Sequence, residues 1–162
     1  VLHARELPPS GGGPTCFLDM RAAYTELEAR QKARIAGQRV VYAYNNRGAF
    51  PSRQSASGPN DELKEVTHPM VRTHPMVGTK SLFIDLDRAT HVEGMPIIEG
   101  RRLLQALQTF AESNAPRAEH EWRDHDVLVW DNASVQHKAS GCFRFGEPRR
   151  FWRYLVRGDR PI

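Results

Sequence analysis

Leu128-Val129-Trp130-Asp131-Asn132-Ala133-Ser134-Val135-Gln136-His137 is a segment in which an apolar run leads into a short polar turn and out again to a single histidine. β-branched and aromatic residues favour strands, and Asp and Asn favour turns because their side chains hydrogen-bond to the nearby backbone. The segment therefore predicts a strand, a turn and the start of a return strand. A histidine in this position can present one imidazole to a metal ion.

A basic and aromatic segment, Arg149-Arg150-Phe151-Trp152-Arg153, follows it. Side chains at alternate positions of a strand share a face, so Arg149, Phe151 and Arg153 project together. Arg150 and Trp152 project to the other side. Guanidinium groups bind carboxylates through two parallel hydrogen bonds, and the first face carries two of them. We therefore predict two anionic ligands at this face, an oxoacid cosubstrate and an acidic substrate.

The composition is that of one globular domain, which we place at residues 1–162. Hydrophobic residues make up 40% and charged residues 26% of the 162 positions, as is usual for soluble proteins. The formal net charge is only +4, and the basic residues are dispersed except between Arg149 and Arg157. This weak basicity argues against a nucleic-acid-binding protein. The sequence also contains no apolar segment long enough for a membrane span, which argues against a membrane protein.

Cys16 and Cys142 are the two cysteines of the chain. They do not form the Cys-x-x-Cys spacing of a zinc site, and we expect separate thiols rather than a disulfide. A cytoplasmic location is the simplest expectation, because thiols stay reduced there.

The rest of the pattern alternates strands with two helical segments. Strands are expected at residues 1–7, 15–18, 40–44, 71–73 and 81–84, with a hairpin turn at 78–80 between the last two. One helix is expected from Met20 to a stop at Gly37, and another after Pro96, where leucines recur at helical spacing. Residues 85–94 are expected to form a loop. The His-Pro pairs at 68–69 and 74–75 indicate structural turns rather than metal ligands.

Residues 45–65 are rich in Ser, Gly, Pro and Asn. A polar loop of this length inside a compact domain often closes over a ligand. We expect a lid in which Arg47 and Arg53 could contact an anion, and a surface loop without such a role is an equal alternative.

Several ordered motifs together resemble the TauD/TfdA family of Fe(II)- and 2-oxoglutarate-dependent dioxygenases. Besides Trp130-Asp131-Asn132 with His137 and the two arginines at 149 and 153, the matching segments are Leu7-Pro8-Pro9-Ser10-Gly11-Gly12 with Thr15, Asp19-Met20-Arg21-Ala22-Ala23-Tyr24, Val71-Arg72-Thr73-His74-Pro75, His91-Val92-Glu93-Gly94-Met95-Pro96 and Glu99-Gly100-Arg101. The resemblance runs through nearly the whole chain. The segments at residues 19–24 and 91–101 are more similar to the phenoxyacetate dioxygenases than to the other branch of the family.

The resemblance implies a role for each candidate residue. His137 is similar to the distal histidine of an iron site built from two histidines and one carboxylate, and would be catalytic as a metal ligand. Thr15 and Arg149 match the residues that bind 2-oxoglutarate, although Pro14 stands where the family usually has Asp. Arg153 matches the residue that binds the carboxylate or sulfonate of the substrate.

Two points stay open in this assignment. Arg150 is a rival of Arg149 for 2-oxoglutarate, because a shift of one residue along the strand would exchange its two faces. The other two iron ligands, a His-x-Asp pair, are expected upstream of Val1, so we expect the chain to be the C-terminal portion of a longer polypeptide. The only His-x-acid candidate, His91-Val92-Glu93, lies on the wrong side of Thr15 for the family order.

The implied fold is mainly β with inserted helices, a double-stranded β-helix of the jelly-roll, cupin-like kind that is incomplete at its N-terminus. The implied reaction uses Fe(II), 2-oxoglutarate and dioxygen to hydroxylate a small anionic organic substrate, with release of succinate and CO2. Aryloxyalkanoates, sulfonates and sulfate esters all fit one substrate arginine. A non-catalytic jelly-roll module that binds anions is the alternative, and the inserted helices could form the interface of a homo-oligomer.

Overall fold

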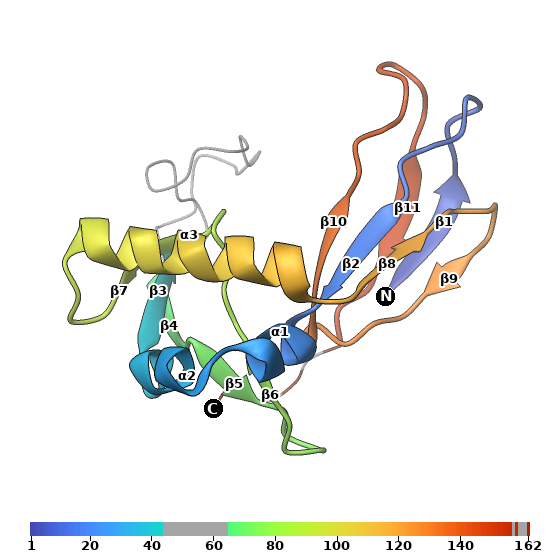
Figure 1. The fold of residues 1–162 in the computed structure, drawn as a ribbon. Helices are drawn as coiled ribbons and strands as arrows, with labels where there is room; N and C mark the ends of the chain where they lie inside the picture. Colours follow the sequence, from blue (N-terminus) through green and yellow to red (C-terminus); the bar gives the residue numbers. More distant parts are fainter. Residues whose placement is uncertain (44–64, 157, 159–161) are drawn as a thin grey trace. The chain divides into compact units, whose positions relative to one another are not determined.

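The computed structural model describes residues 1–43, 65–156, 158 and 162. The chain divides into two compact units, the first formed by residues 1–19 with 116–160 and the second by residues 20–115 with 161–162. Figure 1 shows the elements of both. The predicted lid at 45–65, with Arg47 and Arg53, lies outside the described residues except for Glu65, where a strand begins.

The first unit consists of two three-stranded antiparallel sheets, with strand orders β11-β1-β9 and β10-β2-β8. Their strands are β1 (Leu2–Glu6), β2 (Thr15–Asp19), β8 (Arg117–His120), β9 (Val127–Leu128), β10 (Val135–Ala139) and β11 (Arg150–Arg153). The strands expected at 1–7 and 15–18 are confirmed. The Asp-Asn turn before β10 is confirmed as well, because the Asp131 carboxylate accepts hydrogen bonds from the Ala133 N–H at 2.8 Å and the Ser134 hydroxyl at 2.6 Å.

The second unit packs three helices with two small antiparallel sheets, whose strand orders are β4-β3-β7 and β5-β6. Its elements are α1 (Met20–Glu26), α2 (Ala29–Ile35), β3 (Arg39–Ala43), β4 (Glu65–Pro69), β5 (Val71–Thr73), β6 (Lys80–Leu82), β7 (Ala89–Val92) and α3 (Ile97–Asn114). Helix α3 packs on α1 and β7 and buries Leu103, Leu104 and Leu107, as its spacing predicted. None of the described helices is both long and apolar enough to cross a membrane.

An expected helix and an expected loop were wrong. The single helix from Met20 to Gly37 is two helices, because Glu28 caps α2 through a reciprocal pair of hydrogen bonds with Gln31. The expected loop at 85–94 contains β7, whose buried Ala89 and Val92 pack inward while the strand pairs with β3. The expected hairpin is confirmed, since β5 and β6 pair in antiparallel register across the turn that contains Gly78.

The His74-Pro75 pair lies in that hairpin turn. The Nδ1 atom of His74 accepts hydrogen bonds from the backbone N–H groups of Met76 and Val77, at 3.1 and 3.3 Å. The imidazole thus stabilises a turn, as expected for His74-Pro75. The turn expected at His68-Pro69 was wrong, because both residues lie in strand β4 and pair with β3.

Candidate functional site

Thr15 and His137 lie on the same face of the sheet β10-β2-β8. Thr15 and Phe17 are two residues apart in β2 and therefore share a face. His137 of β10 stands directly opposite Phe17, and directly opposed residues of an antiparallel pair project to the same side. His120 of β8 stands opposite Thr15 in the same way. The sheet thus places the predicted imidazole and hydroxyl on one surface.

His137 is exposed and is flanked by aromatic rings. Its ring centroid lies 4.7 Å from that of Trp130 and 6.3 Å from that of Phe17. Trp130 is itself held by the hydrogen bond from its Nε1 to Asn132 Oδ1, at 2.7 Å. These rings restrict the orientation of the imidazole, which suits a fixed metal ligand.

A metal ion needs more ligands than this one imidazole. Within residues 1–43 and 65–156, the structure brings together no group of three His, Cys, Asp or Glu side chains. The described residues therefore fit a single contribution to a metal site and not a complete site.

Thr15 is almost fully buried, with 3% of its surface exposed. Its Oγ1 accepts a hydrogen bond from Trp122 Nε1 at 3.1 Å. The Trp122 indole is held between two rings that meet it edge to face, His120 and Phe151, each with a centroid distance of 4.7 Å. A buried threonine that hydrogen-bonds in this way to an indole held by two rings has a fixed side chain.

Arg149 lies directly before β11 and is half-buried. Its guanidinium carbon lies 4.4 Å from the centroid of Phe151 and 5.4 Å from that of Phe143. Its Nη2 donates a hydrogen bond to the Gly13 carbonyl oxygen at 2.9 Å, whereas its Nε is buried without a partner. Burial lowers the pKa of the Arg149 guanidinium from its usual value. A buried donor without a partner costs about 1–3 kcal/mol, so an anion here would satisfy it.

A continuous set of contacts connects Arg149 with Thr15. Arg149 lies against Phe151, Phe151 meets Trp122, and Trp122 donates its N–H to Thr15. These contacts link the Arg149 guanidinium to the Thr15 hydroxyl, which lies on the sheet face that carries His137. Opposite orientations of His137 and Arg149 would have excluded a common site.

Arg150 and Arg153 are both exposed. Arg150 forms an ion pair with Glu6, with its Nη2 3.0 Å from Glu6 Oε2. Arg150 thus has a carboxylate partner, whereas the desolvated guanidinium with a free donor belongs to Arg149, which favours Arg149 for the cosubstrate. Arg153 is two residues after Phe151 and shares its face by strand alternation.

The glycine-rich loop before β2 packs against the loop that carries Arg149. Gly12 and Gly13 have φ angles of +86° and +70°. A Cβ atom at Gly12 would overlap the carbonyl oxygen of Cys142, and one at Gly13 would lie 3.0 Å from Arg149 Nε. The backbone N–H of Gly13 donates to the Cys142 carbonyl oxygen at 3.1 Å. Glycine is therefore required for the close approach that positions Arg149.

A histidine–carboxylate pair lies next to Trp122. His120 Nε2 is 3.1 Å from Asp126 Oδ2. The pKa of Asp126 is lowered, first by the hydrogen bond from the Arg123 backbone N–H and then by the neighbouring His120. The carboxylate thus stays ionised and holds the His120 ring against the indole.

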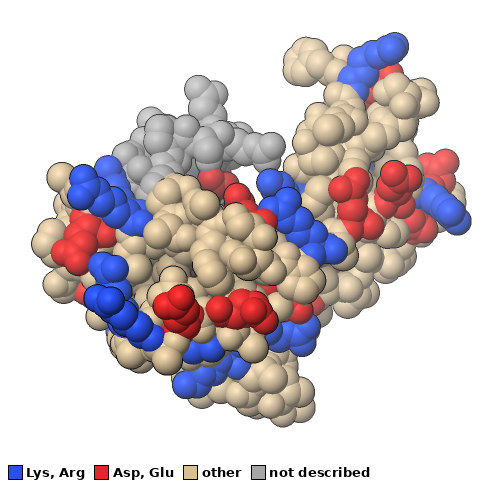
Figure 2. Space-filling model, viewed as in Figure 1, with Lys and Arg blue, Asp and Glu red and all other residues tan. Residues whose placement is uncertain are grey.

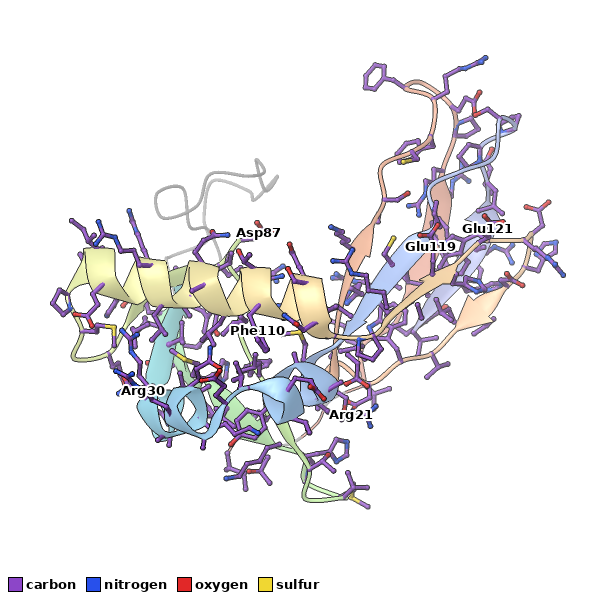
Figure 3. The ribbon with its side chains drawn as sticks, viewed as in Figure 1. Arg21, Arg30, Asp87, Phe110, Glu119 and Glu121 are labelled. Carbon is purple, nitrogen blue, oxygen red and sulfur yellow. The ribbon has the colours of Figure 1, made fainter. Side chains whose placement is uncertain are left out.

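The opposite face of the same sheet carries Cys16. Its Sγ donates to Oε2 of Glu119, which projects from β8 (Figure 3), at 3.5 Å. Burial and this carboxylate raise the pKa of the Cys16 thiol. Both Cys16 and Cys142 are free thiols, as expected.

A cavity of about 360 Å3 borders the glycine-rich loop but not the predicted site residues. Its lining residues are Leu7, Pro8, Pro9, Gly11, Gly12, Trp122, Arg123 and Asp124. On the face drawn in Figure 2, acidic and basic side chains are interspersed.

Trp122, Phe143 and Phe151 are supporting residues that sequence reasoning did not assign. Strand alternation placed Phe151 on the same face as Arg149 but gave it no role. Trp122 carried no usable signal, because its hydrogen-bond partner Thr15 lies 107 residues away in the sequence. Phe143 lies close to Arg149 in the sequence, but its contact with the guanidinium depends on how the loop between them folds.

Comparisons with known proteins show which proteins the chain is similar to. The family model "Taurine catabolism dioxygenase TauD, TfdA family" matches residues 1–155. The chain is 39% identical over 140 residues to the alpha-ketoglutarate-dependent 2,4-dichlorophenoxyacetate dioxygenase of Cupriavidus pinatubonensis, covering 86% of this chain and 48% of that protein. It is 36% identical over 166 residues to the (S)-phenoxypropionate/alpha-ketoglutarate-dioxygenase of Delftia acidovorans, covering 98% and 56% respectively.

A solved structure is similar as well. The structure of AAD-2 in complex with Mn(II) and N-oxalylglycine gives a TM-score of 0.85 at 33% identity, covering 99% of this chain and 63% of that one. The chain spans about half the length of the two dioxygenases that it matches.

Proposed function

Because the chain belongs to the TauD, TfdA family, we propose that it contributes the 2-oxoglutarate-binding part of an Fe(II)-dependent dioxygenase that acts on a small anionic organic substrate. The observation that carries this proposal is the Arg149 guanidinium, which is half-buried and whose Nε has no partner, connected through aromatic rings to the buried Thr15 hydroxyl. Two fixed donors on one side of a sheet fit a carboxylate.

The proposed roles follow from these positions. Arg149 binds the far carboxylate of 2-oxoglutarate through its guanidinium, and Thr15 donates a hydrogen bond to it. The related AAD-2 structure holds N-oxalylglycine, which like 2-oxoglutarate carries a carboxylate at each end. Arg153 binds the acidic group of the substrate, which fixes the distance between the attacked carbon and the metal.

His137 would provide one ligand of the Fe(II) ion, and a His-x-Asp pair outside residues 1–162 would provide the others. Bound iron with 2-oxoglutarate and dioxygen supplies the oxidation that hydroxylates the substrate, with release of succinate and CO2. The imidazole of His137, flanked by the rings of Trp130 and Phe17, would offer a nitrogen lone pair to the metal.

We also propose a fold and a cellular location for the enzyme. The two antiparallel sheets of the first unit would be parts of a jelly-roll in a single catalytic domain covering residues 1–162. The free thiols of Cys16 and Cys142 are consistent with a reducing cytoplasm. Aryloxyalkanoates are the first substrates to examine, because two relatives are named for them, and sulfonates and sulfate esters follow.

The proposal is tested by measuring succinate formation by the full-length protein with Fe(II), 2-oxoglutarate and 2,4-dichlorophenoxyacetate or an alkylsulfonate. We expect turnover that depends on 2-oxoglutarate and is lost in the variant His137→Ala. The matched control is His91→Ala, which removes the histidine of the His91-Val92-Glu93 segment and should retain turnover. Full turnover by His137→Ala would refute the metal role, and 2-oxoglutarate binding without any turnover would favour the non-catalytic anion-binding module.

A further inference from the structure

We propose that Trp122 is a positioning residue for the cosubstrate, because its indole N–H fixes the Thr15 hydroxyl as a hydrogen-bond donor towards the bound carboxylate. This inference rests on the proposed function and adds a residue to its site. It starts from the direction of one hydrogen bond, from Trp122 Nε1 to Thr15 Oγ1 at 3.1 Å.

The chemistry of the indole determines that direction. The indole N–H can only donate, whereas a hydroxyl both donates and accepts. The Thr15 oxygen must therefore be the acceptor of this bond, and its own hydrogen is directed elsewhere. Because Thr15 is 3% exposed, water cannot readily reorganise the hydroxyl, and its hydrogen stays available for an anion.

The surroundings of Trp122 hold the indole rigidly. His120 and Phe151 meet its ring edge to face, at interplanar angles of 89° and 69°. His120 is in turn held by Asp126, and Phe151 carries the Arg149 guanidinium on its ring at 4.4 Å. The Trp122 indole therefore fixes the Thr15 hydroxyl directly, and it also supports the Phe151 ring on which the Arg149 guanidinium lies.

The two contributions of Trp122 can be separated by substitution. The variant Trp122→Phe keeps an aromatic ring between His120 and Phe151 but lacks the N–H donor. In this variant the Thr15 hydroxyl can rotate, so part of its hydrogen bond to the ligand is lost. The net value of one hydrogen bond corresponds to a roughly three- to tenfold change in affinity.

The experiment is isothermal titration calorimetry of the full-length protein with 2-oxoglutarate in the presence of Mn(II), which allows binding without turnover. We expect Trp122→Phe to raise the Kd for 2-oxoglutarate roughly three- to tenfold and to leave the Kd for Mn(II) unchanged. The matched control is Trp152→Phe, because Trp152 projects from the opposite face of β11 and is 48% exposed. That control should leave both values unchanged.

A double-mutant cycle with Thr15→Val shows whether Trp122 acts through the hydroxyl. In the Thr15→Val protein, the added Trp122→Phe change should alter the Kd by less than about twofold, because no hydroxyl remains to be oriented. An equal effect of Trp122→Phe in both backgrounds, or no effect in either, would overturn the inference while the proposed function stands. Absence of 2-oxoglutarate binding by the unsubstituted protein would instead refute the proposed function, and the inference with it.

Discussion

The variant Arg149→Met separates the proposed binding role of this arginine from its structural role. Methionine keeps an unbranched side chain between the rings of Phe143 and Phe151 but removes the guanidinium. Charge-assisted hydrogen bonds to a carboxylate contribute about 1.5–3 kcal/mol, and about 1.4 kcal/mol is a factor of ten in affinity. We therefore expect the Kd of the full-length protein for 2-oxoglutarate to rise roughly 10- to 150-fold.

Stability should respond quite differently to Arg149→Met. The change removes the hydrogen bond to the Gly13 carbonyl, about 0.5–1.5 kcal/mol, and the cation–π contact with Phe151, about 0.5–2 kcal/mol. It also removes a buried Nε without a partner, which costs about 1–3 kcal/mol in the native protein. These contributions nearly cancel, so the free energy of unfolding should change by no more than about 1 kcal/mol.

The matched control for this prediction is Arg150→Met. Arg150 forms an exposed ion pair with Glu6, and such pairs contribute about 0–1 kcal/mol. Calorimetry with 2-oxoglutarate and denaturant unfolding should show an unchanged Kd and a small loss of stability. The reasoning would be refuted if Arg150→Met weakened 2-oxoglutarate binding more than Arg149→Met, or if Arg149→Met left the Kd within twofold.

Three further predictions concern the same unit of the structure. Arg153→Gln should raise the KM for the anionic substrate at least about tenfold and leave the KM for 2-oxoglutarate unchanged, because only the substrate would lose a charge-assisted hydrogen bond. If steady-state kinetics showed a raised KM for 2-oxoglutarate instead, Arg153 would bind the cosubstrate and not the substrate. Gly12→Ala should destabilise the protein by about 2–4 kcal/mol in denaturant unfolding, because its Cβ overlaps a backbone carbonyl, whereas Gly11→Ala, with open space around it, should cost only about 1 kcal/mol. The pKa of Asp126 is lower in the folded protein than in the unfolded chain, where it is near 3.9. The Asp126 carboxylate therefore stabilises the fold above about pH 3.9, and this stabilisation is lost as the pH falls through the lower pKa of the folded protein. The difference in unfolding free energy between the native protein and Asp126→Asn should therefore narrow below about pH 3.9, and a difference that is constant with pH would contradict the lowered pKa of Asp126.

Local sequence signals predicted the elements that depend on short-range chemistry. The turn at Asp131 follows from a side chain that hydrogen-bonds to its own backbone neighbourhood, and the hairpin at Gly78 follows from a residue that accepts a positive φ of +70°. The helix α3 follows from leucines at helical spacing. Each of these patterns is complete within a few residues.

Elements that depend on distant partners were less predictable. The strand β7 lies in a polar region, and what makes it a strand is its pairing with β3, about 50 residues earlier in the chain. The break between α1 and α2 depends on Glu28 and Gln31, whose side chains offer the backbone hydrogen bonds that would otherwise continue the helix. Composition alone favoured one uninterrupted helix.

The candidate site also combines features that the sequence predicted with features that depend on distant partners. The resemblance to a family supplied Thr15, His137 and Arg149, and the alternation of strand positions paired Arg149 with Phe151. The register that places His137 opposite Phe17 joins residues 120 positions apart, which no local pattern contains. Trp122 was missed for the same reason, because its function is defined entirely by contacts that the fold creates.

The most direct test of a shared site for Thr15, Arg149 and His137 is a crystal structure of the full-length protein with Mn(II) and 2-oxoglutarate. We predict that one carboxylate of 2-oxoglutarate lies within hydrogen-bonding distance of the Arg149 guanidinium and the Thr15 hydroxyl, with the His137 imidazole bound to the metal. A 2-oxoglutarate molecule held by Arg150, or a metal ion that His137 does not contact, would contradict this account.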